Sequence, residues 1–101
     1  MRFTYPTALV LQALLEGREH GFDIMDATGL ASGTVYPILR RLDADGVVRS
    51  HWEKDGAARR EQRPPRRCYE LSAGGVLLAR EAIARLRPPR AARLAPRRVE
   101  G

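Results

Sequence analysis

The chain has 101 residues and a net charge of +6, with 18 lysines and arginines against 12 acidic residues. A chain of this length forms one domain with a modest core, so a second copy that buries a further face would add stability. Cys68 is the only cysteine, which excludes an internal disulfide and favours a reducing compartment.

The positive charge is concentrated in two segments. Residues 54–67 carry a net charge of +4 and residues 87–101 carry another +4, so the remainder is slightly acidic. This distribution indicates a polyanionic partner. Nucleic acid is favoured over a membrane surface, because no basic amphipathic helix and no lipidation signal accompany the charge.

The first expected helix begins at Tyr5-Pro6-Thr7 and ends before Gly17. Its apolar stretch, residues 8–15, is too short to span a membrane and lacks a cleavage motif, so we expect a cytoplasmic protein. Apolar residues surround this helix, and we expect one face to meet the core and the other, with Leu9 and Leu11, to meet a second subunit. A generously apolar core helix in a monomer is the alternative.

Two further helices follow in close succession. Residues 20–28 predict a short helix with Phe22, Ile24 and Met25 turned inward, and residues 29–31 predict a tight turn. A longer helix fits between Ser32, as N-cap, and Gly46, which tolerates the left-handed backbone of a helix end. A helix, a short turn containing glycine and a longer capped helix form the helix-turn-helix arrangement.

The longer helix has two distinct faces. Four apolar residues share one third of its circumference and are expected to be buried: Val35, Ile38, Leu39 and Leu42. The opposite arc carries hydroxyl, aromatic and guanidinium groups that can reach phosphates and base edges in a DNA groove. The alternative is a solvated face with two ordinary arginines. Pro37 removes one helical amide and leaves the carbonyl of Gly33 free near the helix start.

Two strands joined by a cationic loop come next. Residues 47–53 alternate, with Val48, Ser50 and Trp52 on one side, and residues 66–71 alternate with Tyr69 and Leu71 on one face. Residues 55–65 have no apolar period, so we expect a flexible loop whose arginines follow a phosphate backbone. Such contacts supply affinity rather than sequence choice.

Three runs of sequence resemble the PadR family of winged-helix transcriptional regulators. They are Gly33-Thr34-Val35-Tyr36-Pro37-Ile38-Leu39-Arg40-Arg41-Leu42, then Asp45-Gly46-Val47-Val48, then Arg67-Cys68-Tyr69-Glu70-Leu71-Ser72-Ala73-Gly74-Gly75, with His20-Gly21-Phe22-Asp23-Ile24 resembling the second-helix motif of the family. The resemblance covers about residues 5–86. It implies an α+β fold, a winged helix-turn-helix with three helices, a two-stranded β wing and a C-terminal dimerisation helix.

The last helix is expected over residues 73–87, with Ser72 as its cap and Pro88-Pro89 as its stop. The resemblance places dimerisation here, and we expect this helix to pack against the first helix of the partner. The expected dimer-interface residues are Leu9, Leu11, Val76, Leu77, Ala79, Ile83 and Leu86. Three parts are thus expected: a winged-helix domain over residues 1–72, the dimerisation helix over 73–87, and a disordered basic tail over 88–101.

The favoured function is a homodimeric, sequence-specific repressor that binds a pseudo-palindromic operator in double-stranded DNA. Its expected DNA-binding residues are Ser32, Gly33, Thr34, Tyr36, Pro37, Arg40, Arg41, Lys54, Arg59, Arg60, Arg63, Arg66 and Arg67. A winged-helix protein-interaction module is the rival from another class. A nonspecific nucleic-acid binder is a third alternative, although the chain lacks a row of stacking aromatics.

Enzyme chemistry is not expected, because the sequence shows no phosphate loop, catalytic carboxylate pair or nucleophile elbow. No cofactor is expected, and His20, His51 and Cys68 do not have zinc spacing. The resemblance suggests a small hydrophobic effector between the subunits, with Trp52 and Tyr5 as lining residues. Cys68 is expected to serve packing, with regulatory oxidation as its alternative.

Overall fold

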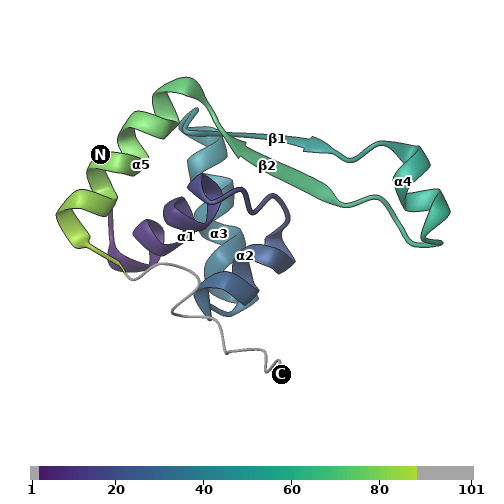
Figure 1. Cartoon of the computed structure of the whole chain (residues 1–101), viewed down its shortest axis with the longest axis horizontal. Coiled ribbons are helices and arrows are strands. Elements are labelled where there is room, and N and C mark those ends of the chain that lie inside the picture. Colours follow the sequence, from purple (N-terminus) through teal and green to yellow (C-terminus); the bar gives the residue numbers. More distant parts are fainter. Residues whose placement is uncertain (1–2, 89–101) are drawn as a thin grey trace.

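The computed structural model describes residues 3–88, which form a helical body and a projecting β ribbon. Figure 1 shows the ribbon leaving the body and ending in a short helix at its far end. The architecture is the expected α+β winged helix-turn-helix. In chain order the elements are α1 (Tyr5–Leu15), α2 (Gly21–Thr28), α3 (Ser32–Ala44), β1 (Val48–Trp52), α4 (Asp55–Arg60), β2 (Arg67–Leu71) and α5 (Ala73–Leu86).

Helix α1 is the centre of the body. Thr4 caps it, since its hydroxyl accepts from the Thr7 amide, and Gly17 follows its end with a φ of 91°. All residues from Thr7 to Leu14 are buried within the single chain, because α2, α3 and α5 pack around the helix. The expectation that a second subunit must cover one face of this helix is therefore wrong.

The turn between α2 and α3 uses glycine and threonine. Gly29 ends α2 with a φ of 76°, and the Thr28 hydroxyl accepts from the Leu30 amide. Helix α3 begins one residue earlier than expected: Ala31 is its N-cap, and its carbonyl accepts from the amides of Thr34 and Val35. Ser32 is thus the first helical residue, and its expected role as N-cap is wrong.

Helix α2 presents a different residue inward than expected. Ile24 is fully buried, but Phe22 is 75% exposed, which corrects its predicted inward position. Gly21 is the buried residue at this end of the helix, and a Cβ there would lie 2.3 Å from the Tyr36 hydroxyl oxygen. The Tyr36 ring therefore packs directly on the backbone at the start of α2, and Phe22, the next residue, turns outward.

Strands β1 and β2 form an antiparallel ribbon, the wing, with Val48 opposite Leu71, Ser50 opposite Tyr69 and Trp52 opposite Arg67. The predicted alternation of both strands is confirmed by this register. Helix α4 occupies part of the segment expected to be a flexible loop. Its sequence, Asp-Gly-Ala-Ala-Arg-Arg, contains strong helix formers. A search for apolar periodicity misses them, because a segment of six residues is too short to show a helical period.

Helix α5 belongs to the same hydrophobic core as the first three helices. Ser72 is its N-cap, as expected, and accepts from the Gly75 amide at 3.0 Å. Ala79 and Ala82 are buried in the central cluster, and the helix lies against α1 of its own chain. Most of the expected disordered tail, residues 89–101, lies outside the described residues. Within residues 3–88, no helix combines the length and apolarity needed to cross a membrane.

Candidate nucleic-acid interface

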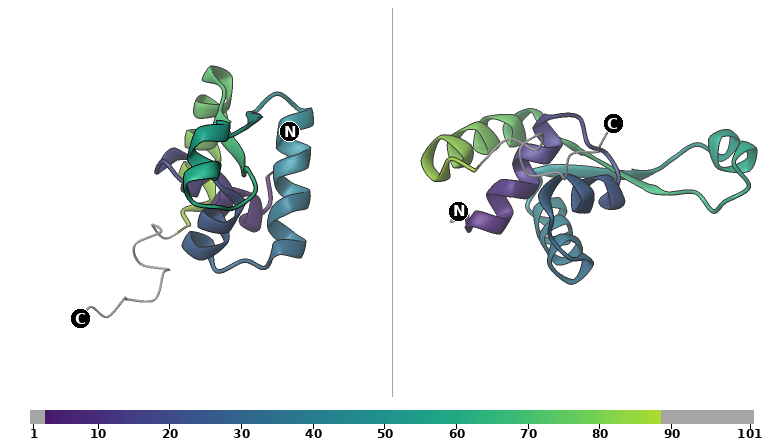
Figure 2. Two further views of the ribbon diagram at one scale, coloured as in Figure 1. Left: turned by 90° about the vertical axis from the view of Figure 1, so that its right-hand side faces the viewer. Right: turned by 60° about the horizontal axis from the view of Figure 1, so that its bottom comes forward.

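One face of α3 is turned to solvent along its length. Val35, Ile38, Leu39 and Leu42 are buried as expected. Four of the expected DNA-binding residues of this helix are exposed on the other side: Ser32, Gly33, Pro37 and Arg40. The left view of Figure 2 shows α3 standing along one side of the molecule, where a groove can approach it.

The remaining expected contacts of α3 differ in accessibility. Thr34 and Tyr36 are half-buried, and the Tyr36 ring is held against Gly21. Arg41 is exposed, but its guanidinium donates to the Thr7 hydroxyl of α1 at 3.4 Å. Arg40 is therefore the guanidinium of this helix best placed to read a base.

Five cations of the expected set are exposed on the wing: Lys54, Arg59, Arg60, Arg66 and Arg67. Lys54 lies two residues after β1, directly before α4. Arg59 and Arg60 lie in the last turn of α4, and Arg66 directly precedes β2. The right view of Figure 2 shows the wing extending well beyond the helical body. Cations on such an arm can contact phosphates beside the base pairs that α3 faces.

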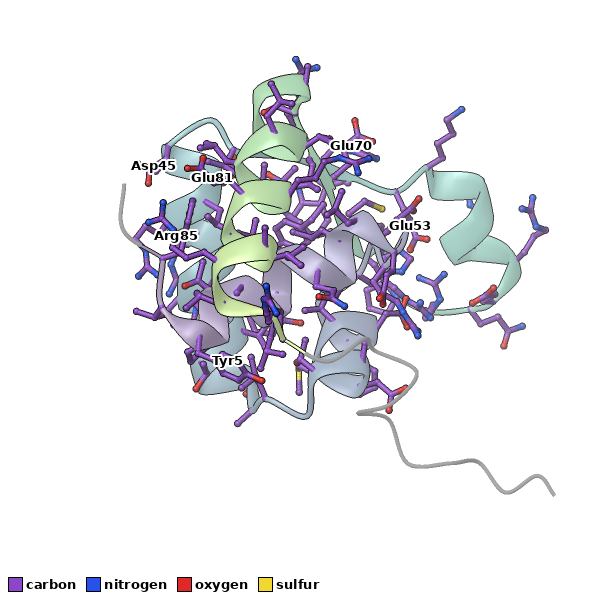
Figure 3. All side chains as sticks on the ribbon, turned by 60° about the vertical axis from the view of Figure 1, so that its left-hand side comes forward. Tyr5, Asp45, Glu53, Glu70, Glu81 and Arg85 are labelled. Atoms are coloured by element: carbon purple, nitrogen blue, oxygen red, sulfur yellow. The ribbon has the colours of Figure 1, made fainter. Side chains whose placement is uncertain are left out.

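Arg63 is not available in the same way. Its guanidinium binds both carboxylate oxygens of Glu53, one of them at 3.1 Å, and also donates to Glu61 at 2.7 Å. The Arg66 amide donates to the same Glu53 carboxylate at 2.8 Å. Hydrogen bonds from Arg63, followed by that amide bond, lower the pKa of Glu53 to about 2. Figure 3 shows Glu53 between the helical body and α4.

The Arg67 guanidinium also contacts other side chains of the protein. Its guanidinium lies 5.1 Å from the centre of the Trp52 ring and donates to the Ser50 hydroxyl at 3.0 Å. Ser50 in turn donates to the carboxylate of Asp43 in α3 at 2.9 Å. This chain of contacts ties the wing to the last turns of α3. Sequence reasoning missed the roles of Asp43 and Glu53, because the tertiary fold brings them to Ser50 and Arg63.

The expected dimer-interface residues fall into two groups. Leu9, Leu11 and Ala79 are at most 7% exposed within the single chain, so their side chains offer no surface to a partner. Leu77 is 70% exposed, and three further residues of α5 are half-buried: Val76, Ile83 and Leu86. Figure 3 shows Glu81 and Arg85 on the same helix, where they form an ion pair at 3.5 Å.

The two residues expected to line an effector site are on different elements. Tyr5 begins α1, whereas Trp52 ends β1, is 60% exposed and contacts the Arg67 guanidinium. A hollow of about 430 Å³ lies instead where α2, α3 and the base of the wing meet. Phe22, Tyr36 and Tyr69 give it an aromatic lining.

Cys68 is buried at the base of the wing, in line with the expected packing role. Burial, followed by the charge of Glu19, raises the pKa of its thiol. A protonated thiol is a poor nucleophile, which disfavours Cys68 as a fast redox sensor.

The fold and this surface agree with a family comparison. The family model described as "Transcriptional regulator PadR-like family" matches residues 10–81. The chain belongs to this family. PadR-like proteins are transcriptional regulators, so the winged helix of this chain is a regulator's DNA-binding fold. No curated protein matches the chain by sequence.

Solved structures show the same fold. The PadR-like transcription factor from Bacteroides fragilis has a TM-score of 0.66 and 24% identity, over 80% of this chain and 79% of that chain. The PcaV regulator from Streptomyces coelicolor, solved with its natural ligand, has a TM-score of 0.63 and 24% identity, over 84% and 58%. A point mutant of ZitR from Lactococcus lactis has a TM-score of 0.67 and 18% identity, over 83% and 53%. The chain thus spans about half the length of ZitR.

Proposed function

We propose that this PadR-like chain is a homodimeric repressor that binds a pseudo-palindromic operator, with α3 of each subunit in the major groove. The observation that carries the proposal is the exposed face of α3 with Arg40 at its centre, flanked by a wing that bears five exposed cations of the expected set. Arginine can bond bidentately to guanine, and wing cations can neutralise the phosphates nearby. Because the proposed operator is part of the chromosome, the proposal places the protein in the cytoplasm.

The test is fluorescence anisotropy of the full chain against its own upstream DNA and a scrambled duplex of equal length, at several salt concentrations. A preference of about 10³-fold or more for the native duplex supports a sequence-specific regulator. With two or three phosphate contacts per subunit, a dimer is expected to show a log–log salt slope of about −4 to −5. Equal binding to both duplexes would favour the nonspecific binder, and no binding to either would favour the protein-interaction module.

We place the dimer contact on the outer surface of α5. Leu77 is 70% exposed there, and its neighbours Val76 and Leu78 are half-buried, so adjacent apolar side chains reach the surface at the start of α5. A contiguous apolar patch of this kind marks an interaction surface. Leu77→Glu is expected to shift the protein from dimer to monomer in sedimentation, and Ser32→Glu, at an exposed position of α3 outside the proposed dimer contact, is its control for added charge. A wild-type protein that is monomeric at micromolar concentration would contradict this placement.

The proposal includes a small hydrophobic effector that releases the operator. PcaV was solved in complex with its natural ligand. In this chain the aromatic hollow between α2, α3 and the wing contacts both parts of the proposed DNA interface. An effector bound there can therefore change their relative position. Phe22→Ala is expected to weaken effector-induced release in the same anisotropy assay while leaving operator affinity intact, since Phe22 is outside the proposed interface.

A further inference from the structure

Three metal-binding groups meet where the segment before α2 crosses the base of the wing. The Glu19 carboxylate, the His20 imidazole and the Cys68 thiol each offer one ligand atom, and these atoms lie within 4.8 Å of one another. Backbone pairing holds the two segments together: His20 forms a β-bridge with Cys68, and the Tyr69 amide donates to the Glu19 carbonyl at 2.7 Å.

The central pair has the spacing that a tetrahedral ion requires. The Cys68 sulfur lies 3.5 Å from His20 Nε2. A sulfur and a nitrogen bound tetrahedrally to one Zn²⁺, at about 2.3 and 2.0 Å, are about 3.5 Å apart. The pair thus needs little rearrangement to share an ion. Glu19 is exposed, and its flexible side chain can close the remaining distance.

The orientation of the imidazole is set by a second carboxylate. Asp23 Oδ2 lies 3.2 Å from His20 Nδ1, which fixes the proton on Nδ1 and leaves the lone pair of Nε2 directed towards Cys68. Histidine ligands in metal sites are commonly held by such a carboxylate on the other ring nitrogen. This contact is therefore a second feature, besides the cluster itself, that fits a metal ligand.

A further imidazole is within reach across the strands. His51 is the register partner of Cys68, so the two side chains lie on the same face of the ribbon. His51 is exposed and able to change rotamer. Both histidines and the single cysteine of the chain thus gather at this place.

The geometry points to a Zn²⁺ site formed by Glu19, His20 and Cys68, with water or His51 as the fourth ligand. Thiolate and imidazole together favour zinc over magnesium or calcium, which prefer oxygen ligands alone. The bound ion would fasten the α1–α2 connection to β2. The inference does not depend on the proposed function, because DNA takes no part in the site.

The test is titration of the full chain with Co²⁺, followed by displacement with Zn²⁺. A thiolate bound to Co²⁺ gives a charge-transfer absorption in the near ultraviolet, and in this protein such a band can come only from Cys68. We expect saturation near one equivalent per chain and loss of the band on adding Zn²⁺. Absence of the band at several equivalents would overturn the inference.

Variants distinguish a site with several protein ligands from binding of the ion by the Cys68 thiol alone. Glu19→Gln and His20→Ala are each expected to weaken Co²⁺ binding at least tenfold, and Asp23→Asn by about 10- to 100-fold, as for other outer-shell carboxylates. Glu70→Gln, an exposed carboxylate on the same strand, is the matched control and should bind as the wild type does. Unchanged affinity in both Glu19→Gln and His20→Ala would overturn the site.

Cys68→Ser tests the thiol itself. If the variant folds, judged by circular dichroism, the charge-transfer band must disappear, and a persisting band contradicts the inference. Because Cys68 is buried, this variant can fail to fold. The exposed Glu19 then provides the deciding variant, since its substitution leaves the core untouched.

Discussion

Arg63 holds Glu53 through both carboxylate oxygens, across ten residues of chain, and so closes the base of the loop that contains α4. The pair explains why the segment has a defined path although it contains no apolar stripe. It also reduces the number of cations in residues 54–67 that are available to DNA. One of the arginines expected to contact DNA neutralises the acids of the wing instead.

The pH dependence of the wing should follow from this pair. The pKa of Glu53 is lowered from 4.5 to about 2, first by hydrogen bonds from Arg63. Because the folded-state pKa is the lower one, the contribution of the carboxylate is fully present above about pH 4.5 and is lost as the pH falls towards 2. We expect the fluorescence of Trp52, the only tryptophan, to change in that window.

Glu53→Gln is the control for that titration, because it removes the titrating group while keeping the size of the side chain. Its fluorescence between pH 4.5 and 2 should lack the wild-type transition. An identical transition in both proteins would assign the change to other carboxylates and contradict the role of the pair.

The salt dependence of DNA binding should distinguish the wing arginines. Arg59→Ala removes an exposed cation, so the log–log salt slope should fall in magnitude by about 1 for each phosphate that Arg59 neutralises. Arg63→Ala removes a paired cation, so DNA affinity should fall through disorder of the wing, with little change in slope. Anisotropy across salt concentrations measures both quantities. Equal slope changes in the two variants would mean that Arg63 leaves Glu53 to bind phosphate.

Local patterns predicted the elements of this fold well. The stripe of α3, the Ser72 cap and the alternation of β1 were all visible, since each depends on residues a few positions apart. The positions of Phe22 and Leu11 were not visible. Whether Phe22 turns inward depends on Gly21 meeting Tyr36, and burial of Leu11 depends on α5, which begins about sixty residues later.

The candidate sites show the same division between features set by neighbouring residues and features set by the tertiary fold. Arg40 stands out because the helical wheel separates it from the buried stripe. The pairing of Arg63 with Glu53 and the approach of His20 to Cys68, 48 residues apart, are products of the tertiary fold. Zinc spacing within one short segment is therefore the wrong pattern to seek when the ligands come from two segments far apart in sequence, here the connection before α2 and strand β2.

The packing of α5 on the loop before β1 should depend on the absence of a side chain at residue 75. A Cβ at Gly75 would lie 2.0 Å from the Val47 carbonyl oxygen, which is backbone and cannot rotate away. Gly75→Ala should therefore lower the free energy of unfolding by about 1–3 kcal/mol, measured by urea denaturation. At Gly74 a Cβ meets nothing within 4 Å. Gly74→Ala should raise stability by about 0.5–1 kcal/mol, and a decrease there would contradict this packing account.

Base recognition should depend on Arg40 more than on its neighbour. Arg40 is exposed on the outer face of α3, whereas Arg41 reaches back to the Thr7 hydroxyl. Arg40→Ala should weaken binding to the native duplex by about 1–3 kcal/mol and relax specificity at the base pair it contacts. Anisotropy against duplexes with single base-pair changes measures that relaxation.

Arg41→Ala is the matched control for Arg40→Ala, since it removes the same charge one position along the same helix. It should lower affinity for native and scrambled duplexes alike, because a guanidinium turned towards α1 can act on DNA only through its charge. If Arg40→Ala also weakens both duplexes equally, Arg40 contacts phosphate and the base is read elsewhere. If Arg41→Ala alone relaxes specificity, the guanidinium leaves Thr7 on binding and α3 presents a different face to the groove.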